Sequence, residues 1–214
     1  LIQNILQAGP ERIEPPCPVY QECGGCQWQH THYAEQLRAK RQLLLETLCK
    51  VGGWAFEDID NVVQPVWGMD NPWAYRNKAQ FPVQLVNGKI QLGFYRHRSH
   101  QVMPLNHCLI QHEVMNEMLL FLQASLQDLQ GQGLTAYDEA SHHGFLRHVV
   151  IRHGFKTNES LVGFVATSDQ GKGLLRSLAQ QIMAHFPTVK GVVLNINPER
   201  TNRILGQTTE VLAG

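Results

Sequence analysis

The chain has 214 residues, of which 43% are hydrophobic and 17% charged, and its formal net charge is zero. Such values are typical of a globular protein with one or two domains, and they give no global sign of a nucleic-acid or membrane partner. No apolar run approaches the roughly 20 residues of a transmembrane helix, and the start lacks a signal-peptide pattern. We therefore expect a cytoplasmic protein without membrane contact. Because the chain starts at Leu1 and ends at Gly214, we also expect a piece of a longer protein.

The first half of the chain predicts a strand, a helix and a hairpin. Leucines recur at helical spacing before Gly52-Gly53, and Asn87-Gly88 is a strong signal for a two-residue hairpin turn. The predicted elements are a strand at Ile2–Leu6, a helix at His32–Val51, and strands at 79–85 and 89–95.

The second half predicts two helices and further strands. These are a helix at Val114–Leu129, strands at Phe145–Ile151 and Leu161–Ala166, a helix at Gly173–His185, and a buried strand at Val192–Ile196. This order of hairpins and helices favours an α+β fold with a mainly antiparallel sheet and flanking helices over a doubly wound sheet.

Cysteines are clustered near the start of the chain. Cys17, Cys23 and Cys26 lie within one glycine-rich segment, and Cys108 could return as a fourth thiolate ligand from a distant segment. In a reducing compartment such cysteines are more often metal ligands than disulfides. A triplet with one distant partner favours an iron–sulfur cluster over structural zinc, which usually pairs two short hairpins. Cys49 lies on the apolar side of a predicted helix and is interpreted as a core residue.

Positive charge is segregated although the net charge is zero. No Asp or Glu occurs between Asp70 and Glu113 or between Glu139 and Glu159. Basic residues in these windows could contact a phosphate backbone, and nearby aromatic rings such as Phe94 and Tyr95 could stack on bases. The alternative is a set of solvated sheet faces. The candidate RNA contacts are Arg76, Lys78, Arg96, Arg98, Arg147 and Arg152.

Catalytic signatures are missing from the sequence. It contains no G-x-G-x-x-G after a strand, no Walker loop and no G-x-S-x-G elbow, and no carboxylate pair stands out as an acid/base couple. We therefore predict no catalytic residue in this chain.

Several motifs resemble a known family. The segment Cys17-x5-Cys23-Gly24-Gly25-Cys26, continuing to Gln27-Trp28-Gln29-His30, resembles the cluster-binding segment of bacterial RNA 5-methyluridine methyltransferases. The similarity is greatest to those that modify 23S ribosomal RNA. Further motifs follow in the same order; they are Tyr75-Arg76-Asn77-Lys78, Gly93-Phe94-Tyr95, Cys108, Leu146 to Arg152, and Asn195-Ile196-Asn197.

The resemblance implies a domain organisation and a cofactor. Residues 1–9 would be the remnant of an N-terminal TRAM barrel, residues 10–205 the central iron–sulfur and RNA-binding domain, and residues 206–214 the lead-in to a missing methyltransferase domain. Cys17, Cys23, Cys26 and Cys108 would hold a [4Fe–4S] cluster with a structural role.

The resemblance also implies the reaction of the whole protein. Family members transfer a methyl group from S-adenosylmethionine to C5 of uridine, after a cysteine thiolate adds to C6, and a carboxylate then removes the C5 proton. No residue here matches those groups, so we expect this chain alone to be inactive. We expect a monomer whose partner is RNA, in particular 23S rRNA. The alternatives are a non-catalytic zinc module that binds RNA or protein, and a redox sensor.

Overall fold

The computed structural model describes residues 4–214, and these divide into two compact units. The first unit contains residues up to Gln21 and residues Cys26–Pro72, and the second contains Glu22–Gly25 and Trp73–Gly214. The tip of the cysteine-rich segment therefore belongs to the second unit. Within the residues predicted as one central domain, 10–205, the structure thus distinguishes two units.

The first unit is built on two helices, α1 (Tyr33–Lys50) and α2 (Phe56–Asp60). Leu45 of α1 is fully buried. Arg41 of α1 forms hydrogen bonds with the end of α2 and the residues that follow it. The Arg41 guanidinium donates hydrogen bonds to the Asp60 carbonyl oxygen at 2.6 Å and to the Val63 carbonyl oxygen at 2.9 Å. The predicted helix at His32–Val51 is confirmed as α1. Of the predicted strand Ile2–Leu6, residues 2 and 3 lie outside the described residues, and residues 4–6 are not a strand.

The second unit is a seven-stranded sheet with the strand order β3-β2-β1-β4-β5-β6-β7. Neighbouring strands are antiparallel except β5 and β6, which are parallel and are connected through α4. The strands are β1 (Lys78–Val86), β2 (Lys89–Tyr95), β3 (Val102–Pro104), β4 (Leu146–Gly154), β5 (Glu159–Ala166), β6 (Val189–Ile196) and β7 (Thr208–Ala213). The mainly antiparallel α+β prediction is confirmed, and residues 206–214 contribute the edge strand β7.

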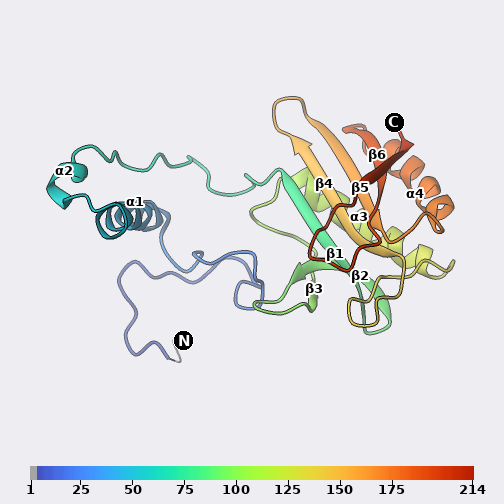
Figure 1. The fold of residues 1–214 in the computed structure, drawn as a ribbon, viewed down its shortest axis with the longest axis horizontal. Helices are drawn as coiled ribbons and strands as arrows, with labels where there is room; N and C mark the ends of the chain where they lie inside the picture. The colour runs from blue at the N-terminus through green and yellow to red at the C-terminus, as the bar shows by residue number, and fades with distance from the viewer. Residues whose placement is uncertain (1–3) are drawn as a thin grey trace. The chain divides into compact units, whose positions relative to one another are not determined.

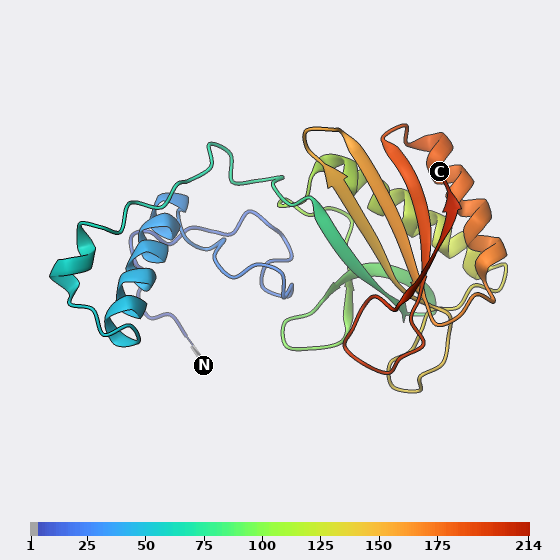
Figure 2. The same cartoon turned by 45° about the horizontal axis from the view of Figure 1, so that its top comes forward.

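Two helices, α3 (Glu113–Gln130) and α4 (Lys172–His185), cover one face of this sheet (Figures 1 and 2). Their apolar stripes bury Leu119 and Leu122 of α3 and Leu175 of α4 against strand residues such as Phe81 and Phe164. In the central strands β4 and β5 most residues are buried, whereas β1 keeps half-buried polar positions at Lys78 and Gln80. Among the described residues, no helix is long and apolar enough to cross a membrane.

The β1–β2 hairpin turns as its sequence predicts. Asn87 and Gly88 both adopt positive φ values, of 50° and 77°, which a two-residue turn with the twist of a hairpin requires. The turn fixes the register, so Val86 pairs with Lys89 and Val83 with Leu92.

Candidate nucleic-acid interface

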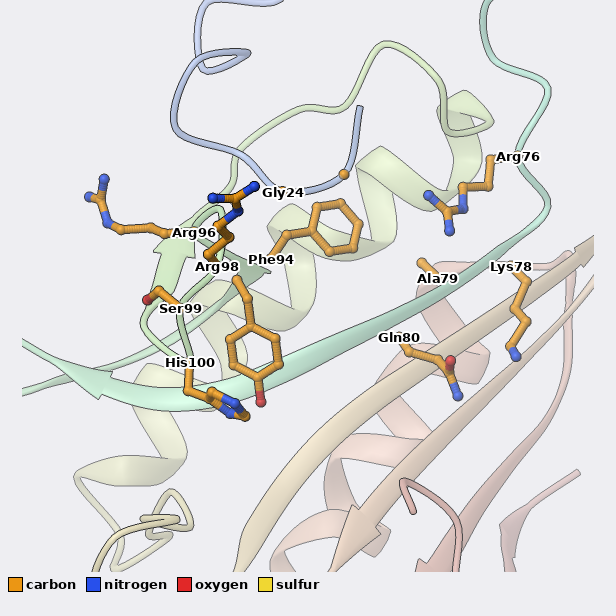
Figure 3. Close-up of a pocket in the computed structure, with 12 residues that line it drawn as sticks. Gly24, Arg76, Lys78, Ala79, Gln80, Phe94, Arg96, Arg98, Ser99 and His100 are labelled. Atoms are coloured by element: carbon orange, nitrogen blue, oxygen red, sulfur yellow. The ribbon is translucent and has the colours of Figure 1, made fainter. Parts of the chain in front are cut away.

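A cleft opens in the second unit where β1 and β2 diverge. The ladder between these strands ends at the Val83–Leu92 pair. Before that point, residues 78–82 of β1 pair only with β4 among the described strands, whereas residues 93–95 of β2 pair with β3. The cleft between the diverging strands has a volume of about 670 Å³ (Figure 3).

Gly93 explains why β2 can leave β1 for β3. A Cβ atom at position 93 would lie 1.8 Å from the carbonyl oxygen of Met103, so only glycine allows β3 to approach this closely. Phe94, the next residue, stacks on Phe81 with ring centroids 5.3 Å apart, and it also lines the cleft. The close β2–β3 pairing therefore determines where the cleft forms.

The tip of the cysteine-rich segment forms one wall of the cleft. The Gly24 amide donates a hydrogen bond to the Tyr95 carbonyl oxygen at 3.1 Å, and the His97 amide donates to the Glu22 carbonyl oxygen at 2.9 Å. An ion pair between Glu22 and Arg96 adds a side-chain connection. Gly24 and Gly25 consequently line the cleft, and in Figure 3 Gly24 lies beside the Arg98 guanidinium and the Phe94 ring.

The cleft is positively charged. Arg76, Lys78, Arg96, Arg98 and His100 line it, and no carboxylate does so among the described residues. Glu22 compensates Arg96 from the cysteine-rich segment. For Arg76, Lys78 and Arg98 the described part of the chain provides no ion-pair partner, so their charges are available to an anionic ligand.

Glu139 contacts two side chains that line the cleft. Its carboxylate accepts a hydrogen bond from the Tyr95 hydroxyl at 3.1 Å and lies 3.0 Å from Nδ1 of His100. Burial, and then the Glu139 charge, raise the pKa of Tyr95 well above its usual value. The phenol therefore remains protonated, as a hydroxyl that donates to Glu139 must be.

The predicted RNA contacts divide into three groups. Arg76, Lys78, Arg96 and Arg98, although separated in sequence, come together in the cleft. Arg152 is exposed on β4 opposite Lys78, and both line an adjoining depression of about 440 Å³.

Arg147 forms the third group, because it is only 5% exposed. Its guanidinium donates to the carbonyl oxygens of Asn197 and Glu199 at 2.8 and 2.7 Å and lies 4.7 Å from the centre of the Tyr137 ring. This geometry gives Arg147 a packing role, so the predicted RNA contact at this residue does not fit the structure.

The four predicted cysteine ligands are all half-buried. Cys17 and Cys26 belong to the first unit, and Cys23 and Cys108 to the second. No group of three or more His, Cys, Asp or Glu side chains among residues 4–214 is arranged to hold a metal ion. The predicted cluster loop is therefore not shown. Cys49, predicted to be a core residue, is half-buried on α1.

Local structure around two of the cysteines nevertheless suits a thiolate-bound centre. The Gly25 amide donates to Sγ of Cys23 at 3.3 Å, and such amide–sulfur bonds are typical around cluster ligands. The Cys108 backbone is held by Asn116, which is 2% exposed, accepts from the Cys108 amide at 3.0 Å and donates to its carbonyl oxygen at 3.2 Å. The donor set fits either an iron–sulfur cluster or zinc.

Two polar residues of the second unit are not among the predicted site residues. Gln80 lines the cleft two residues after Lys78, and the period-two alternation of a strand could have placed both on the same face. Gln111 is fully buried, and neither its amide oxygen nor its amide nitrogen has a hydrogen-bond partner among the described residues. No pattern in the sequence distinguishes it from an exposed glutamine.

The chain has relatives among known proteins. No family model matches the chain. It is 39% identical over 213 residues to a protein of Halalkalibacterium halodurans named an uncharacterized RNA methyltransferase, covering 100% of this chain and 45% of that protein. Proteins of the same name from Bacillus cereus and Nostoc are 41% and 38% identical, again with 100% of this chain and 45% of the relative covered.

A solved structure shares the fold. It is the Pyrococcus abyssi tRNA (uracil-54, C5)-methyltransferase in complex with S-adenosyl-L-homocysteine, which matches with a TM-score of 0.66 and 18% identity. The match covers 97% of this chain and 43% of that one. The chain is thus similar along its whole length to proteins named RNA methyltransferases, and it spans about half the length of the curated relatives that it matches.

Proposed function

We propose that the chain is the RNA-recognition part of an RNA (uracil-5-)-methyltransferase that uses S-adenosylmethionine. The observation that carries this proposal is the convergence of Arg76, Lys78 and Arg98 in one cleft without compensating carboxylates among the described residues. Such a cleft attracts a phosphate backbone, since most nonspecific affinity for nucleic acid comes from Lys and Arg contacts to phosphates. The names of the relatives and the fold of the solved tRNA methyltransferase support RNA as the substrate.

Methyl transfer requires residues that this chain does not provide. We assign no catalytic residue here, and we expect the reaction to need the remainder of the protein, including the S-adenosylmethionine site. Uridine in 23S rRNA is the proposed target, on the basis of the motifs around Cys17–His30. The solved relative is named for tRNA, so tRNA is the competing substrate to test.

By this proposal the full-length gene product is present in the cytoplasm. The experiment incubates it with S-adenosylmethionine that carries a labelled methyl group. Unmodified 23S rRNA and tRNA are supplied separately, and nucleosides are analysed by mass spectrometry. We expect label in 5-methyluridine of 23S rRNA. Label only in tRNA would show that tRNA, and not 23S rRNA, is the substrate. No label in either RNA would overturn the enzymatic proposal. The 214-residue chain alone is expected to give no label.

We further propose that Cys17, Cys23, Cys26 and Cys108 hold a [4Fe–4S] cluster. When bound, the cluster would supply a cross-link between distant segments rather than reaction chemistry. The hydrogen bond from Gly25 to Cys23 Sγ and the Asn116 contacts to Cys108 support these ligands.

Metal and sulfide analysis after anaerobic purification tests the ligand assignment. Iron with equimolar acid-labile sulfide is expected, and it should be lost in Cys108→Ala but kept in Cys49→Ala. One zinc ion and no sulfide would favour the alternative, a non-catalytic zinc module. Retention of full iron by Cys108→Ala would remove Cys108 from the ligand set.

A further inference from the structure

We propose that the cleft between β1 and β2 binds one unpaired nucleotide of a single-stranded RNA segment. Arg76 and Arg98 would contact the phosphates, and the base would lie against Phe94 and the side chain of Gln80. This inference rests on the RNA-binding part of the proposed function and specifies its ligand.

The size of the cleft favours a nucleotide over a duplex backbone. Its volume of about 670 Å³ falls within the range of about 300–1,000 Å³ that is typical of sites for small organic ligands. A base within a duplex is stacked and paired, so it cannot enter such a concavity. Single-stranded segments can present an unstacked base to a pocket of this kind.

The residues that line the cleft offer an unpaired base an aromatic surface and a hydrogen-bonding amide. Phe94 is half-buried, stacks on Phe81 and also lines the cleft, so it offers an apolar ring surface held in place by its neighbour. The Gln80 amide carries both donors and an acceptor, and no described residue forms a hydrogen bond with it. In Figure 3, Lys78 and Gln80 project side by side from β1.

The backbone adds further polar groups. Residues 78–82 have a strand partner on only one side among the described strands, namely β4. Backbone N–H and C=O groups on the other edge of a strand are ready to pair with a ligand. A base edge presents donors and acceptors of the same kind, whereas a phosphate presents acceptors alone.

Charge on the rim matches a single strand that enters and leaves the cleft. Arg76 precedes β1, and Arg98 lies in the loop after β2 with a positive φ of 54°. The two cations therefore come from opposite sides of the diverging strands. A nucleotide between them would have cations available to the phosphates on either side of its ribose.

The test compares binding of a 12-nucleotide single-stranded RNA with a blunt RNA duplex of equal length, by fluorescence anisotropy. The wild-type chain should bind the single strand about tenfold more tightly, since stacking of a base on an aromatic ring has a comparable value. Gln80→Leu should weaken single-strand binding severalfold and leave duplex binding unchanged. Lys89→Ala, in which the altered residue is exposed at the start of β2 outside the cleft, should change neither.

Photocrosslinking provides a readout that does not depend on a variant. With 4-thiouridine in the single strand, crosslinks should map to the peptides that contain Gln80 or Phe94. Crosslinks confined to other peptides, or equal affinity for single strand and duplex, would overturn the nucleotide proposal while RNA binding itself would stand. Absence of binding to either RNA would instead overturn the proposed function.

Discussion

The Gly24 amide donates a hydrogen bond of 3.1 Å to the Tyr95 carbonyl oxygen, which joins the cysteine-rich segment to the end of β2. Glu22, two residues earlier, forms an ion pair with Arg96 at the same junction. One short segment therefore forms a wall of the cleft and also neutralises one of its cations.

Replacing Glu22 should increase RNA affinity. Glu22→Gln releases Arg96 to contact phosphate, and the backbone hydrogen bonds of Gly24 and His97 keep the wall in place. Affinity for single-stranded RNA should rise about two- to fivefold. The log–log slope of affinity against salt concentration should become steeper by about 0.7 for the one added phosphate contact. Stability should fall by no more than about 1 kcal/mol, since the pair is partly exposed.

Glu35→Gln is the matched control for this charge change. Glu35 pairs with Arg38 on α1, so its replacement also removes one negative charge from an ion pair. It should leave the RNA affinity unchanged. An equal gain in both variants would show that net charge, and not Arg96, determines the effect.

Two buried amide side chains should respond to substitution with opposite signs. The side-chain amide of Gln111 has no hydrogen-bond partner among the described residues, so Gln111→Leu removes an uncompensated desolvation cost and should raise the free energy of unfolding by about 1 kcal/mol. Asn116 bonds both backbone groups of Cys108, so Asn116→Leu should lower it by about 2 kcal/mol. Urea denaturation of both variants measures this, and a loss of stability in Gln111→Leu would contradict the account.

Gly93 should be intolerant of any side chain. Gly93→Ala places a methyl group against the Met103 carbonyl, and we expect a loss of about 2–4 kcal/mol, measured by thermal or urea unfolding. The control is Gly173→Ala in α4, where a Cβ has no atom within 4 Å and stability should rise by about 0.5 kcal/mol. Similar stability of Gly93→Ala and the wild type would disprove the close β2–β3 approach.

Acid should destabilise the second unit through His148. Burial, and then the charge of Arg147, lower the pKa of His148 from 6.5 to about 4. Between these two values the unfolded chain binds a proton that the folded chain does not, so stability is lost as the pH falls from about 6.5 to 4. The loss is on the order of 3 kcal/mol for this shift.

Burial also lowers the pKa of His153, and this adds to the same slope. His148→Gln should flatten most of the pH dependence in urea titrations at several pH values. An unchanged slope in this variant would contradict the assignment to His148.

Sequence patterns were sufficient for most elements but not for the edges of the sheet. Helical periodicity and the Asn87-Gly88 turn correctly predicted α1, α3, α4 and the β1–β2 hairpin. The strands β3 and β7 were missed. Val102–Pro104 is too short for a pattern, and in β7 only Leu212 is buried, so no alternation is visible.

The site was predictable in its charge but not in its geometry. The segregation of acids and bases indicated Arg76, Lys78, Arg96 and Arg98, yet their convergence depends on the divergence of β1 and β2 at Gly93. The RNA contact predicted at Arg147 does not fit the structure, for a local reason. The register of β4 shifts between Leu146 and His148, which removes Arg147 from the regular alternation on which a sequence pattern relies.

The central claim is that the cleft between β1 and β2 binds RNA, and the salt dependence of single-stranded RNA binding to Arg76→Ala/Arg98→Ala tests it most directly. The account predicts at least tenfold weaker binding, and a log–log salt slope smaller by about 1.4, for two lost phosphate contacts. Lys89→Ala should retain the wild-type affinity and nearly the wild-type slope. Wild-type affinity and slope in the double variant would contradict the claim.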